Sequence, residues 1–137
     1  MCATVRRAEY YYATFENKSG VARGLMDLFQ KKGVQLVAFT AFPTHAGVAQ
    51  IDFFAEKPNA LRAALAEVGV QLIGPRYAFL IQGADDIGAV VEHHKALADA
   101  GINVIAANGV TDNAGRFGYV LWVAPEDYEK AAEALGV

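Results

Sequence analysis

The sequence predicts an α+β fold in which a β-α-β-β-α-β module of roughly 70 residues occurs twice. The first observation is an internal repeat. Three glycines recur 68 residues later, and the pairs are Gly20 with Gly88, Gly33 with Gly101, and Gly47 with Gly115. The second is that β-prone runs alternate with apolar stripes at helical spacing in both copies. Hydrophobic residues make up 54% of the chain and charged residues 20%, which is enough apolar material for a packed core. We expect two modules, residues 1–74 and 75–137.

Aromatic and β-prone residues predict the first strand, over Tyr10–Phe15. The polar run Asn17–Gly20 is typical of a turn, and Ser19 is the expected N-cap of the first helix. Apolar residues then follow at helical spacing from Val21, and two lysines before Gly33 suit a helix end. The first copy therefore begins with a strand and a helix.

The rest of the first copy is predicted as two strands, a helix and a short strand. Leu36–Phe42 and Val48–Ala55 form the two strands, and Pro58 suits the first turn of the helix. Val70–Ile73 is the expected fourth strand, which Gly74-Pro75 ends. This order is the split β-α-β arrangement of ferredoxin-like folds, an antiparallel sheet with both helices on one face.

The second copy repeats this order but stops one strand short. Its strand, helix, strand, strand and helix are expected over Tyr77–Gln82, Asp86–Ala100, Ile102–Ala107, Phe117–Val123 and Pro125–Leu135. No fourth strand is predicted, which would leave an unpaired edge beside the first strand of this copy. We expect the N-terminal stretch Ala3–Arg7, or a strand of a second chain, to cover that edge.

Composition excludes several classes of protein. The chain has 12 basic and 15 acidic residues, a net charge of −3, so no basic excess indicates a nucleic-acid partner. A single cysteine, Cys2, excludes a disulfide framework and a cysteine-based zinc site. No apolar run approaches the roughly 20 residues that span a bilayer, and no secretory signal begins the sequence. We therefore expect a cytoplasmic protein without membrane contact and without a cofactor.

One motif in each copy resembles the first turn of the ACT domain, a small regulatory module that binds amino acids. Asp85–Val90, followed by Leu97–Val104, resembles the family's acidic or amide residue, two spacers and glycine, then a helix and an apolar strand. Asn17–Val21 resembles the Asn-x-Pro-Gly form of ACT modules that regulate amino-acid biosynthesis. Ser19 and Ile87 stand where that form has proline. The resemblance covers nearly the whole chain and implies an ACT-like tandem protein without a separate catalytic domain.

The resemblance also implies a ligand site at the loop before the first helix of each copy. Carried over to this sequence, the ligand-binding residues are Asn17, Ser19, Gly20, Val21, Asp85, Ile87, Gly88 and Ala89. A helix N-terminus presents unpaired N–H groups that suit a carboxylate, and glycine lets a ligand approach the backbone. Asn17 and Asp85 could accept hydrogen bonds from the ligand's ammonium group. The alternative is that these polar residues only cap the helices.

The adjacent His93 and His94 do not predict a metal site. Neighbouring helical residues point roughly 100° apart, whereas metal-binding histidine pairs prefer a spacing of four residues. Glu92, the carboxylate beside them, points elsewhere. We expect one histidine to be partly buried and the other solvated. The alternative is that a histidine touches a ligand or makes association pH-dependent.

The sheet face opposite the helices is expected to be apolar. Phe54 and Trp122 occupy corresponding positions in the two copies, and Val120 lies two residues before Trp122 on the same face. An apolar patch of this kind usually marks a contact, so we expect an interface with another subunit or with a client enzyme. The alternative is a scatter of surface aromatic residues.

These observations favour a regulatory protein that senses a free amino acid or a similar small carboxylate. It would act through allostery, as a homodimer or larger homo-oligomer, by changing its own assembly or by modulating an enzyme of amino-acid metabolism. The alternative is a ligand-free interaction subunit that docks on a client enzyme. An enzyme is not expected, because Asp52 and His45 are the only candidate acid and base and nothing places them together. No catalytic residue is therefore predicted.

Overall fold

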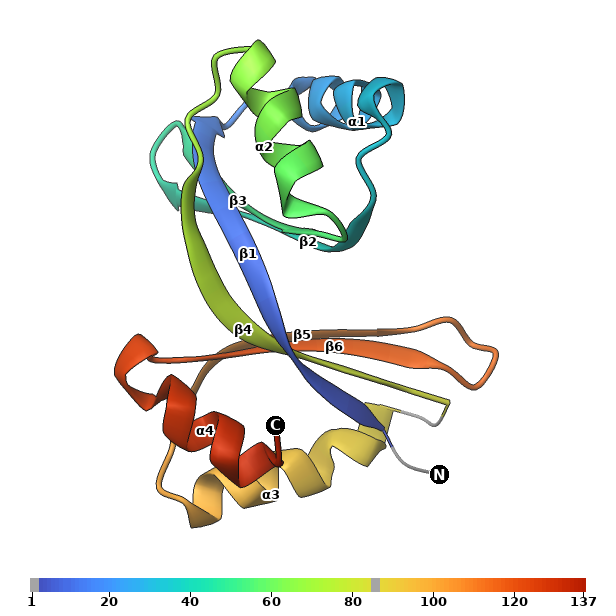
Figure 1. The fold of residues 1–137 in the computed structure, drawn as a ribbon, viewed down its shortest axis with the longest axis vertical. Coiled ribbons are helices and arrows are strands. Elements are labelled where there is room, and N and C mark those ends of the chain that lie inside the picture. Colours follow the sequence, from blue (N-terminus) through green and yellow to red (C-terminus); the bar gives the residue numbers. More distant parts are fainter. Residues whose placement is uncertain (1–2, 85–86) are drawn as a thin grey trace. The chain divides into compact units, whose positions relative to one another are not determined.

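A computed structural model describes residues 3–84 and 87–137 of the chain, so the predicted ligand residue Asp85 and the single cysteine, Cys2, lie outside the described residues. The chain folds into a series of strands and helices (Figure 1). Their bounds are β1 (Thr4–Glu16), α1 (Val21–Lys32), β2 (Leu36–His45), β3 (Val48–Ala55), α2 (Pro58–Glu67), β4 (Ile73–Gly83), η1 (Ile87–Val90), α3 (Val91–Asp99), β5 (Val104–Thr111), β6 (Phe117–Val123), η2 (Pro125–Asp127) and α4 (Tyr128–Leu135). The strands form a six-stranded sheet in the order β2-β3-β1-β4-β6-β5. The predicted α+β class and its repeated module are confirmed.

Strand β4 corrects the sequence prediction at the junction of the two copies. Two strands were expected, over Val70–Ile73 and Tyr77–Gln82, but one continuous strand runs from Ile73 to Gly83. Gly74 explains how the strand continues. Its φ is +145°, and a side chain there would place its Cβ 2.9 Å from the Tyr11 ring. Only glycine lets the backbone pass this close to β1 in this conformation.

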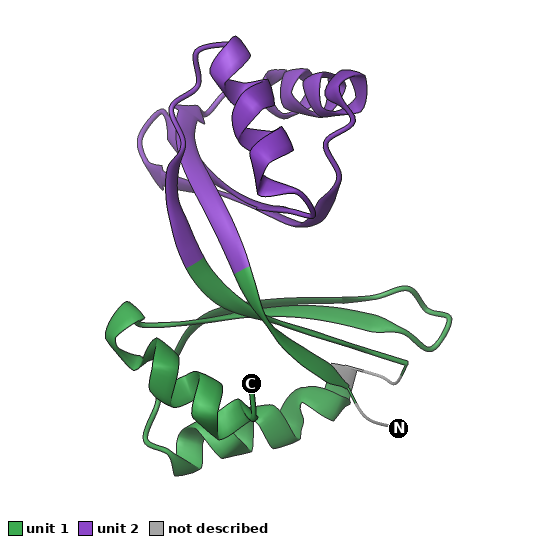
Figure 2. Ribbon diagram, in the orientation of Figure 1, with its two compact units in different colours: residues 1–8, 77–137 green, residues 9–76 purple. Residues whose placement is uncertain are grey.

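The chain forms two compact units, drawn in different colours in Figure 2. Unit 2 contains residues 9–76, and unit 1 contains residues 1–8 together with 77–137. Strands β1 and β4 therefore each contribute residues to both units. The boundary expected between residues 74 and 75 falls within β4, and the first eight residues belong with the second copy of the repeat.

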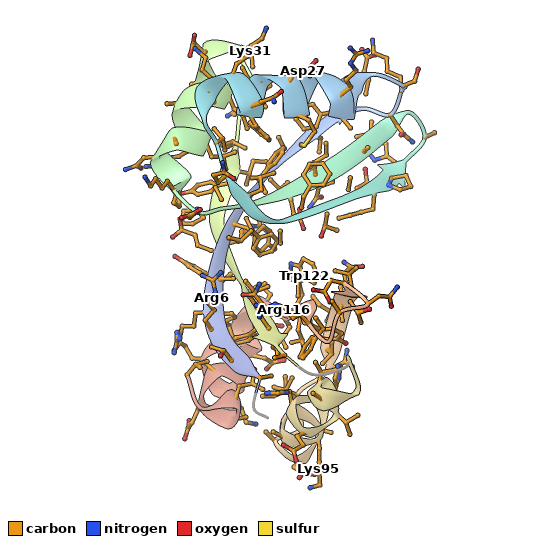
Figure 3. The ribbon with its side chains drawn as sticks, turned by 90° about the vertical axis from the view of Figure 1, so that its right-hand side faces the viewer. Arg6, Asp27, Lys31, Lys95, Arg116 and Trp122 are labelled. Atoms are coloured by element: carbon orange, nitrogen blue, oxygen red, sulfur yellow. The ribbon has the colours of Figure 1, made fainter. Side chains whose placement is uncertain are left out.

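The core of unit 2 lies between one face of its strands and the two helices α1 and α2. Phe53 of β3 is fully buried, and its ring meets the Phe29 ring edge-on at 5.6 Å between centroids. Leu61 and Leu65 of α2 are also fully buried. Figure 3 shows Asp27 and Lys31 of α1 pointing away from the sheet. As predicted, α1 ends at Gly33, which adopts the left-handed conformation with φ +68°.

The N-terminal part of β1 supplies the strand that the second copy lacks. Ala3 and Val5 pack against the buried cluster formed by Ile81, Val90 and Phe117 in unit 1. On β4, a Cβ added to Gly83 would lie 3.3 Å from the Ala3 Cα atom. The expectation that Ala3–Arg7 covers this edge is therefore confirmed.

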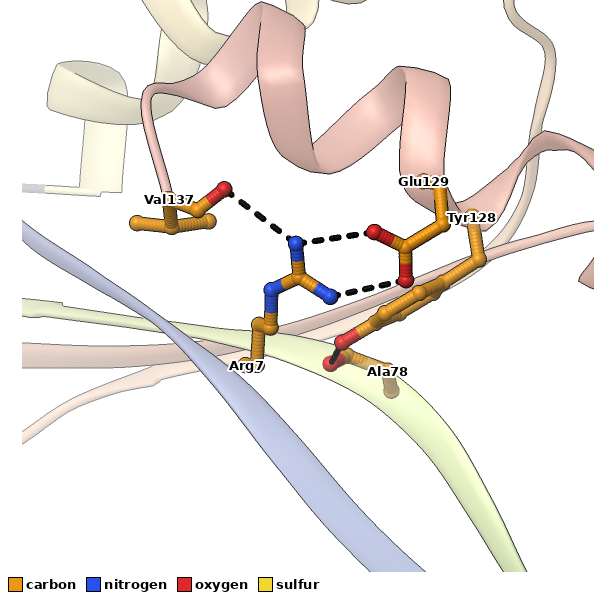
Figure 4. A network of polar contacts seen from close by, with 5 residues as sticks. All are labelled: Arg7, Ala78, Tyr128, Glu129 and Val137. Atoms are coloured by element: carbon orange, nitrogen blue, oxygen red, sulfur yellow. Dashed lines mark hydrogen bonds and ion pairs between the residues drawn. The ribbon is translucent and has the colours of Figure 1, made fainter.

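Polar contacts hold the N-terminal part of β1 to α4 (Figure 4). The Arg7 guanidinium donates to both carboxylate oxygens of Glu129, at 2.8 and 3.0 Å, and to the carbonyl oxygen of Val137 at 3.5 Å. Beside it, the Tyr128 hydroxyl donates to the Ala78 carbonyl oxygen at 2.9 Å. The Tyr128 ring stacks on Phe79 at 4.5 Å between centroids. Helix α4 is thereby attached to β1 and β4 of the same unit.

Candidate functional site

Helix α1 begins one residue later than the sequence predicts. The N-cap is Gly20 rather than Ser19, because residue 20 takes a φ of +93°, which glycine tolerates and serine does not favour. The first backbone bond of the helix runs from the Gly24 N–H to the Gly20 carbonyl oxygen at 3.0 Å. The N–H groups of residues 21–23 precede this bond, so they point out of the helix end without an intrahelical acceptor.

Polar groups surround this helix start without capping it. Asn17 and Ser19 are exposed, and within residues 3–84 and 87–137 neither side chain makes a hydrogen bond. The loop is instead held by its backbone, since the Asn17 N–H donates to the Gly47 carbonyl oxygen at 3.0 Å. A Cβ added at Gly20 would meet no atom within 4 Å, so the approach is open. The alternative of simple helix capping has no side-chain contact to support it in this loop of the described structure.

The electrostatics of this helix start favour an anion. The first turn of α1 contains no acidic residue. Lys18 lies in the loop itself and pairs with the exposed Glu16 at 3.0 Å. Val21, the last predicted ligand residue of this loop, is half-buried and packs on the core of unit 2. The start of α1 therefore combines N–H groups that have no intrahelical acceptor, open access at Gly20 and a first turn without an acidic residue.

The corresponding loop of the second copy is built differently. The predicted helix over Asp86–Ala100 is split, because Ile87–Val90 forms the short 3₁₀ helix η1 and α3 begins only at Val91. Gly88 is exposed, and Ala89 is half-buried against the cluster of Ile81, Val90 and Phe117. Glu92 lies in the first turn of α3, where a negative charge disfavours an anionic ligand.

A hydrogen-bonded histidine and tyrosine lie beside η1. His94 Nε2 and the Tyr119 hydroxyl are 2.8 Å apart, and the two rings meet edge-on with centroids 5.7 Å apart. Tyr119 and Ala89 pack on the same apolar cluster, and burial raises the pKa of the Tyr119 hydroxyl. Sequence reasoning singled out His94 but missed Tyr119, whose only signal was its place on the helix-facing side of β6. Together the two side chains can donate or accept one further hydrogen bond.

His93 is also partly buried, so the expectation that one of the two histidines is solvated is wrong. Its Nδ1 atom is buried and, among the residues described, has no hydrogen-bond partner. Both histidines lie on α3, four and three positions before the buried Leu97. Each histidine therefore lies next to the helix face that packs on the core. In the described part of the chain, no three His, Cys, Asp or Glu side chains gather in a way that could hold a metal ion.

Asp52 is the buried charged residue of unit 2, on the sheet face opposite the helices. It is 4% exposed, and Gln50 Nε2 donates to its Oδ1 at 2.9 Å. Burial raises the pKa of the Asp52 carboxyl, while the Gln50 bond and the charge of Arg76 act in the opposite direction. Arg76 itself lies over the Tyr12 ring, 5.1 Å from its centroid.

The structure does not bring Asp52 and His45 together as an acid and base. Asp52 pairs with Thr40 across β2 and β3, whereas His45 pairs with Val48 near the far end of β2. His45 is exposed, and its Nδ1 lies 3.2 Å from the Thr44 hydroxyl. These two side chains therefore do not form a catalytic pair.

Phe54, Val120 and Trp122, the expected interface residues, are buried in the single chain at 1%, 7% and 7% exposure. The Phe54 ring contacts Tyr10 at 4.8 Å between centroids. They are not scattered surface aromatics. An interface through these three residues stays a prediction, and it would require their side chains to be uncovered first.

No protein-family model matches the sequence, and no curated protein matches it significantly. Among the described residues, no helix is both long and apolar enough to cross a membrane. Solved structures do match over nearly the whole chain. Protein BT0572 from Bacteroides thetaiotaomicron is 18% identical with a TM-score of 0.78, and the match covers 96% of this chain and 88% of that one.

Regulatory subunits of aspartate kinase share the same fold. The subunit from Thermus flavus is 18% identical with a TM-score of 0.61, and 99% of this chain and 95% of that one are covered. Aspartokinase III from E. coli, solved in complex with lysine and aspartate, has a TM-score of 0.52 at 11% identity over 97% of this chain and 31% of that one. The resemblance to tandem ACT proteins is thus confirmed at the level of the fold.

Proposed function

We propose that the chain is a regulatory protein that binds a free amino acid or a similar small carboxylate. It would modulate an enzyme of amino-acid metabolism or its own assembly. The observation that carries this proposal is the start of α1, where an exposed Gly20 in the left-handed conformation leads a helix whose first N–H groups have no side-chain cap. The fold shared with regulatory subunits of aspartate kinase supports a regulatory rather than a catalytic role.

The ligand's carboxylate would accept hydrogen bonds from the N–H groups of residues 21–23, at the positive end of the helix dipole. Asn17 Oδ1 would accept from the ligand's ammonium group, and the Ser19 hydroxyl lies in the same exposed loop. These two side chains have no competing hydrogen bond in the described structure, so binding would not have to break one.

The loop that precedes α3 is the second proposed position, with Ile87, Gly88 and Ala89 contributing backbone groups and Asp85 its carboxylate. Glu92 in the first turn of α3 makes this loop less favourable for a carboxylate than the loop before α1. We therefore propose the α1 loop as the stronger of the two sites.

A thermal-shift screen against the twenty amino acids and related carboxylates tests the proposal. A ligand that binds only the folded state stabilises it by about 2.7 kcal/mol at about 100 times its Kd, which raises Tm. Gly20→Val should abolish the rise, because the side chain blocks the approach to the N–H groups and strains a residue with φ +93°. Gly69→Val is the matched control, because Gly69 also has a positive φ, of +74°, and a Cβ added there would likewise meet no atom within 4 Å. Gly69 lies in the same unit but far from Gly20 in the sequence.

The expected result is a dose-dependent rise in Tm for one chemical class, retained in Gly69→Val and lost in Gly20→Val. Equal loss in both variants would show that backbone strain, rather than the site, controls binding. No rise for any compound at millimolar concentration would contradict ligand binding and favour the ligand-free interaction subunit.

A further inference from the structure

Asp52 is the one buried polar or charged residue among residues 3–84 and 87–137. It lies within β3, between β2 and β1, where aspartate is disfavoured in a strand and an isolated buried charge is costly. In the described structure Asp52 forms no ion pair, and Gln50 is its one hydrogen-bond donor, at Oδ1. The fold therefore holds a carboxylate that its own side chains satisfy only in part.

The second oxygen of this carboxylate, Oδ2, reaches the surface. In the described part of the chain it receives no hydrogen bond. It is nevertheless absent from the side-chain atoms there that are both buried and without a partner, among which His93 Nδ1 is found. Oδ2 is therefore in contact with solvent, although Asp52 as a whole is only 4% exposed. A buried acidic group with one open oxygen is typical of a binding site.

Other oxygen acceptors lie beside Oδ2. Thr40 is directly opposite Asp52 on β2, so its side chain lies on the same sheet face, with the two Cβ atoms about 5 Å apart. Gln50 lies two residues before Asp52 on that face and uses its Nε2 atom to hold Oδ1, which leaves Gln50 Oε1 as an acceptor. Both side chains are half-buried. Three acceptors therefore share this area: Asp52 Oδ2, Gln50 Oε1 and the Thr40 hydroxyl.

Aromatic rings border the same area. Tyr12 is directly opposite Asp52 on β1, and the exposed Phe42 is directly opposite Gln50 on β2. The Arg76 guanidinium lies 5.1 Å from the centroid of the Tyr12 ring, so this ring already attracts a cation. Arg76 occupies the ring without forming an ion pair with Asp52 in the described structure, and the open oxygen stays available to another cation.

We propose that this face of unit 2 binds a small primary alkylammonium ion at the Asp52 carboxylate. An ammonium group has three N–H donors and no acceptor, which matches the three oxygen acceptors of Asp52, Gln50 and Thr40. Its alkyl chain would lie along the neighbouring aromatic rings. A guanidinium fits less well, because its fork needs both oxygens of one carboxylate and Gln50 already holds Oδ1.

This site is separate from the carboxylate site proposed at the start of α1. Phe53 packs in the core under the helices, and successive strand residues face opposite sides, so Asp52 lies on the sheet face away from α1 and α2. An alkylamine has no carboxylate that the N–H groups of residues 21–23 could bind. The two sites therefore take different chemical groups, and either one can exist without the other.

The buried carboxylate also makes sense as a ligand-binding group in energetic terms. A charge in the middle of a sheet that no described cation pairs with lowers the stability of the free protein. Proteins retain such groups at functional sites, where a ligand supplies the missing partner. A cation bound at Asp52 would remove that cost, so binding should stabilise the folded state.

Titration of the full chain with n-butylammonium chloride at pH 7 and constant ionic strength, followed by amide chemical shifts, tests the proposal. We expect saturable changes at Thr40, Gln50 and Asp52, with residues 21–23 unchanged. Two control compounds separate charge from shape and hydrogen bonding. n-Butanol has the same alkyl chain without the charge, and tetramethylammonium has the charge without an N–H donor. Neither should reproduce the saturable changes.

Three variants assign the binding to the carboxylate. Asp52→Asn keeps an acceptor for Gln50 and should raise the dissociation constant about tenfold or more, because it removes a charge-assisted hydrogen bond. Asp27→Asn is the matched control, since it removes an exposed carboxylate of the same unit and should leave binding unchanged. Arg76→Gln should lower the dissociation constant, because the Arg76 charge acts on the same carboxylate and opposes a second cation.

Any of four results would overturn the proposal. They are the absence of saturable changes up to about 100 mM n-butylammonium, unchanged binding by Asp52→Asn, equal loss of binding in Asp27→Asn, and equally tight binding of tetramethylammonium. The amide spectrum of each variant reports its fold in the same experiment, so a folding defect is distinguished from a loss of binding.

Discussion

Helices α1 and α3 occupy corresponding positions in the repeat, yet they begin in different ways. Helix α1 follows directly from Gly20 in the left-handed conformation. Helix α3 follows the 3₁₀ helix η1, and its N-cap, Val90, has an ordinary helical conformation. A repeated glycine therefore preserves the position of a turn but not its geometry, which depends on the residues around it.

The two units also differ in charge, which affects what their helix starts can bind. Unit 2 contains seven basic and six acidic residues, a net charge of +1, whereas the net charge of unit 1 is −4. The first turn of α1 has no acidic residue, and that of α3 contains Glu92. A carboxylate would therefore be favoured at the helix start of unit 2 over that of unit 1.

The largest change in stability is expected in the N-terminal part of β1, which belongs to unit 1. Val5→Asp would place a carboxylate against the apolar cluster of Ile81, Val90 and Phe117, at an expected cost of about 2 kcal/mol or more. Arg6→Asp, on the neighbouring exposed position, is the control and should change stability little. Hydrogen exchange should show faster exchange in β4 and β6 of unit 1 for Val5→Asp alone. Equal exchange in the two variants would contradict the role of this strand.

A smaller change, an increase in stability rather than a loss, is expected when Asp52 of unit 2 is replaced. Because burial raises the pKa of this carboxyl in the folded state, ionised Asp52 opposes folding at neutral pH. Asp52→Asn keeps an acceptor for Gln50 and should raise Tm at pH 7. As pH falls through the raised pKa, the native carboxyl takes up a proton and the advantage of the variant should shrink toward pH of about 4. A lower Tm for the variant at pH 7 would show that the carboxylate is needed.

The smallest effect is expected for the ion pair between Arg7 and Glu129. Both side chains are largely solvated, with 44% and 78% exposed, so solvent screens the pair and its removal by Glu129→Gln should lower Tm only slightly. Arg7 lowers the pKa of Glu129, so the contribution of the pair is present above about pH 4.5 and is lost as pH falls through the lowered pKa. High salt should reduce the difference between variant and native protein. A large difference that salt does not change would contradict this assignment.

Much of the fold could be predicted from local patterns. The points where the prediction was wrong depend on contacts between residues that are distant in the sequence. Apolar spacing and the paired glycines placed both copies of the module. The continuity of β4 could not be predicted, because Gly74-Pro75 is typical of a strand end and only the close approach to Tyr11 shows why the strand continues. The burial of Phe54 and Trp122 likewise depends on the folded chain rather than on their alternation along strands.

At the candidate site, the position of the helix start was predicted but its detail was not. The Asn17–Val21 motif located the start of α1, yet the choice between Ser19 and Gly20 as N-cap depends on a backbone φ that residue types alone do not fix. Tyr119 was missed because its partner, His94, lies 25 positions earlier in the sequence, and a pair at that separation leaves no periodic signal.

Chemical-shift mapping of the amides with the amino acid that the thermal screen selects is the most direct test of the central claim. If the ligand's carboxylate binds the start of α1, the N–H resonances of residues 21–23 should show the largest changes, with smaller changes at Ile87–Ala89. Gly20→Val should remove these changes and Gly69→Val should retain them. A ligand that binds while leaving residues 21–23 unshifted would contradict the proposed carboxylate site at the start of α1.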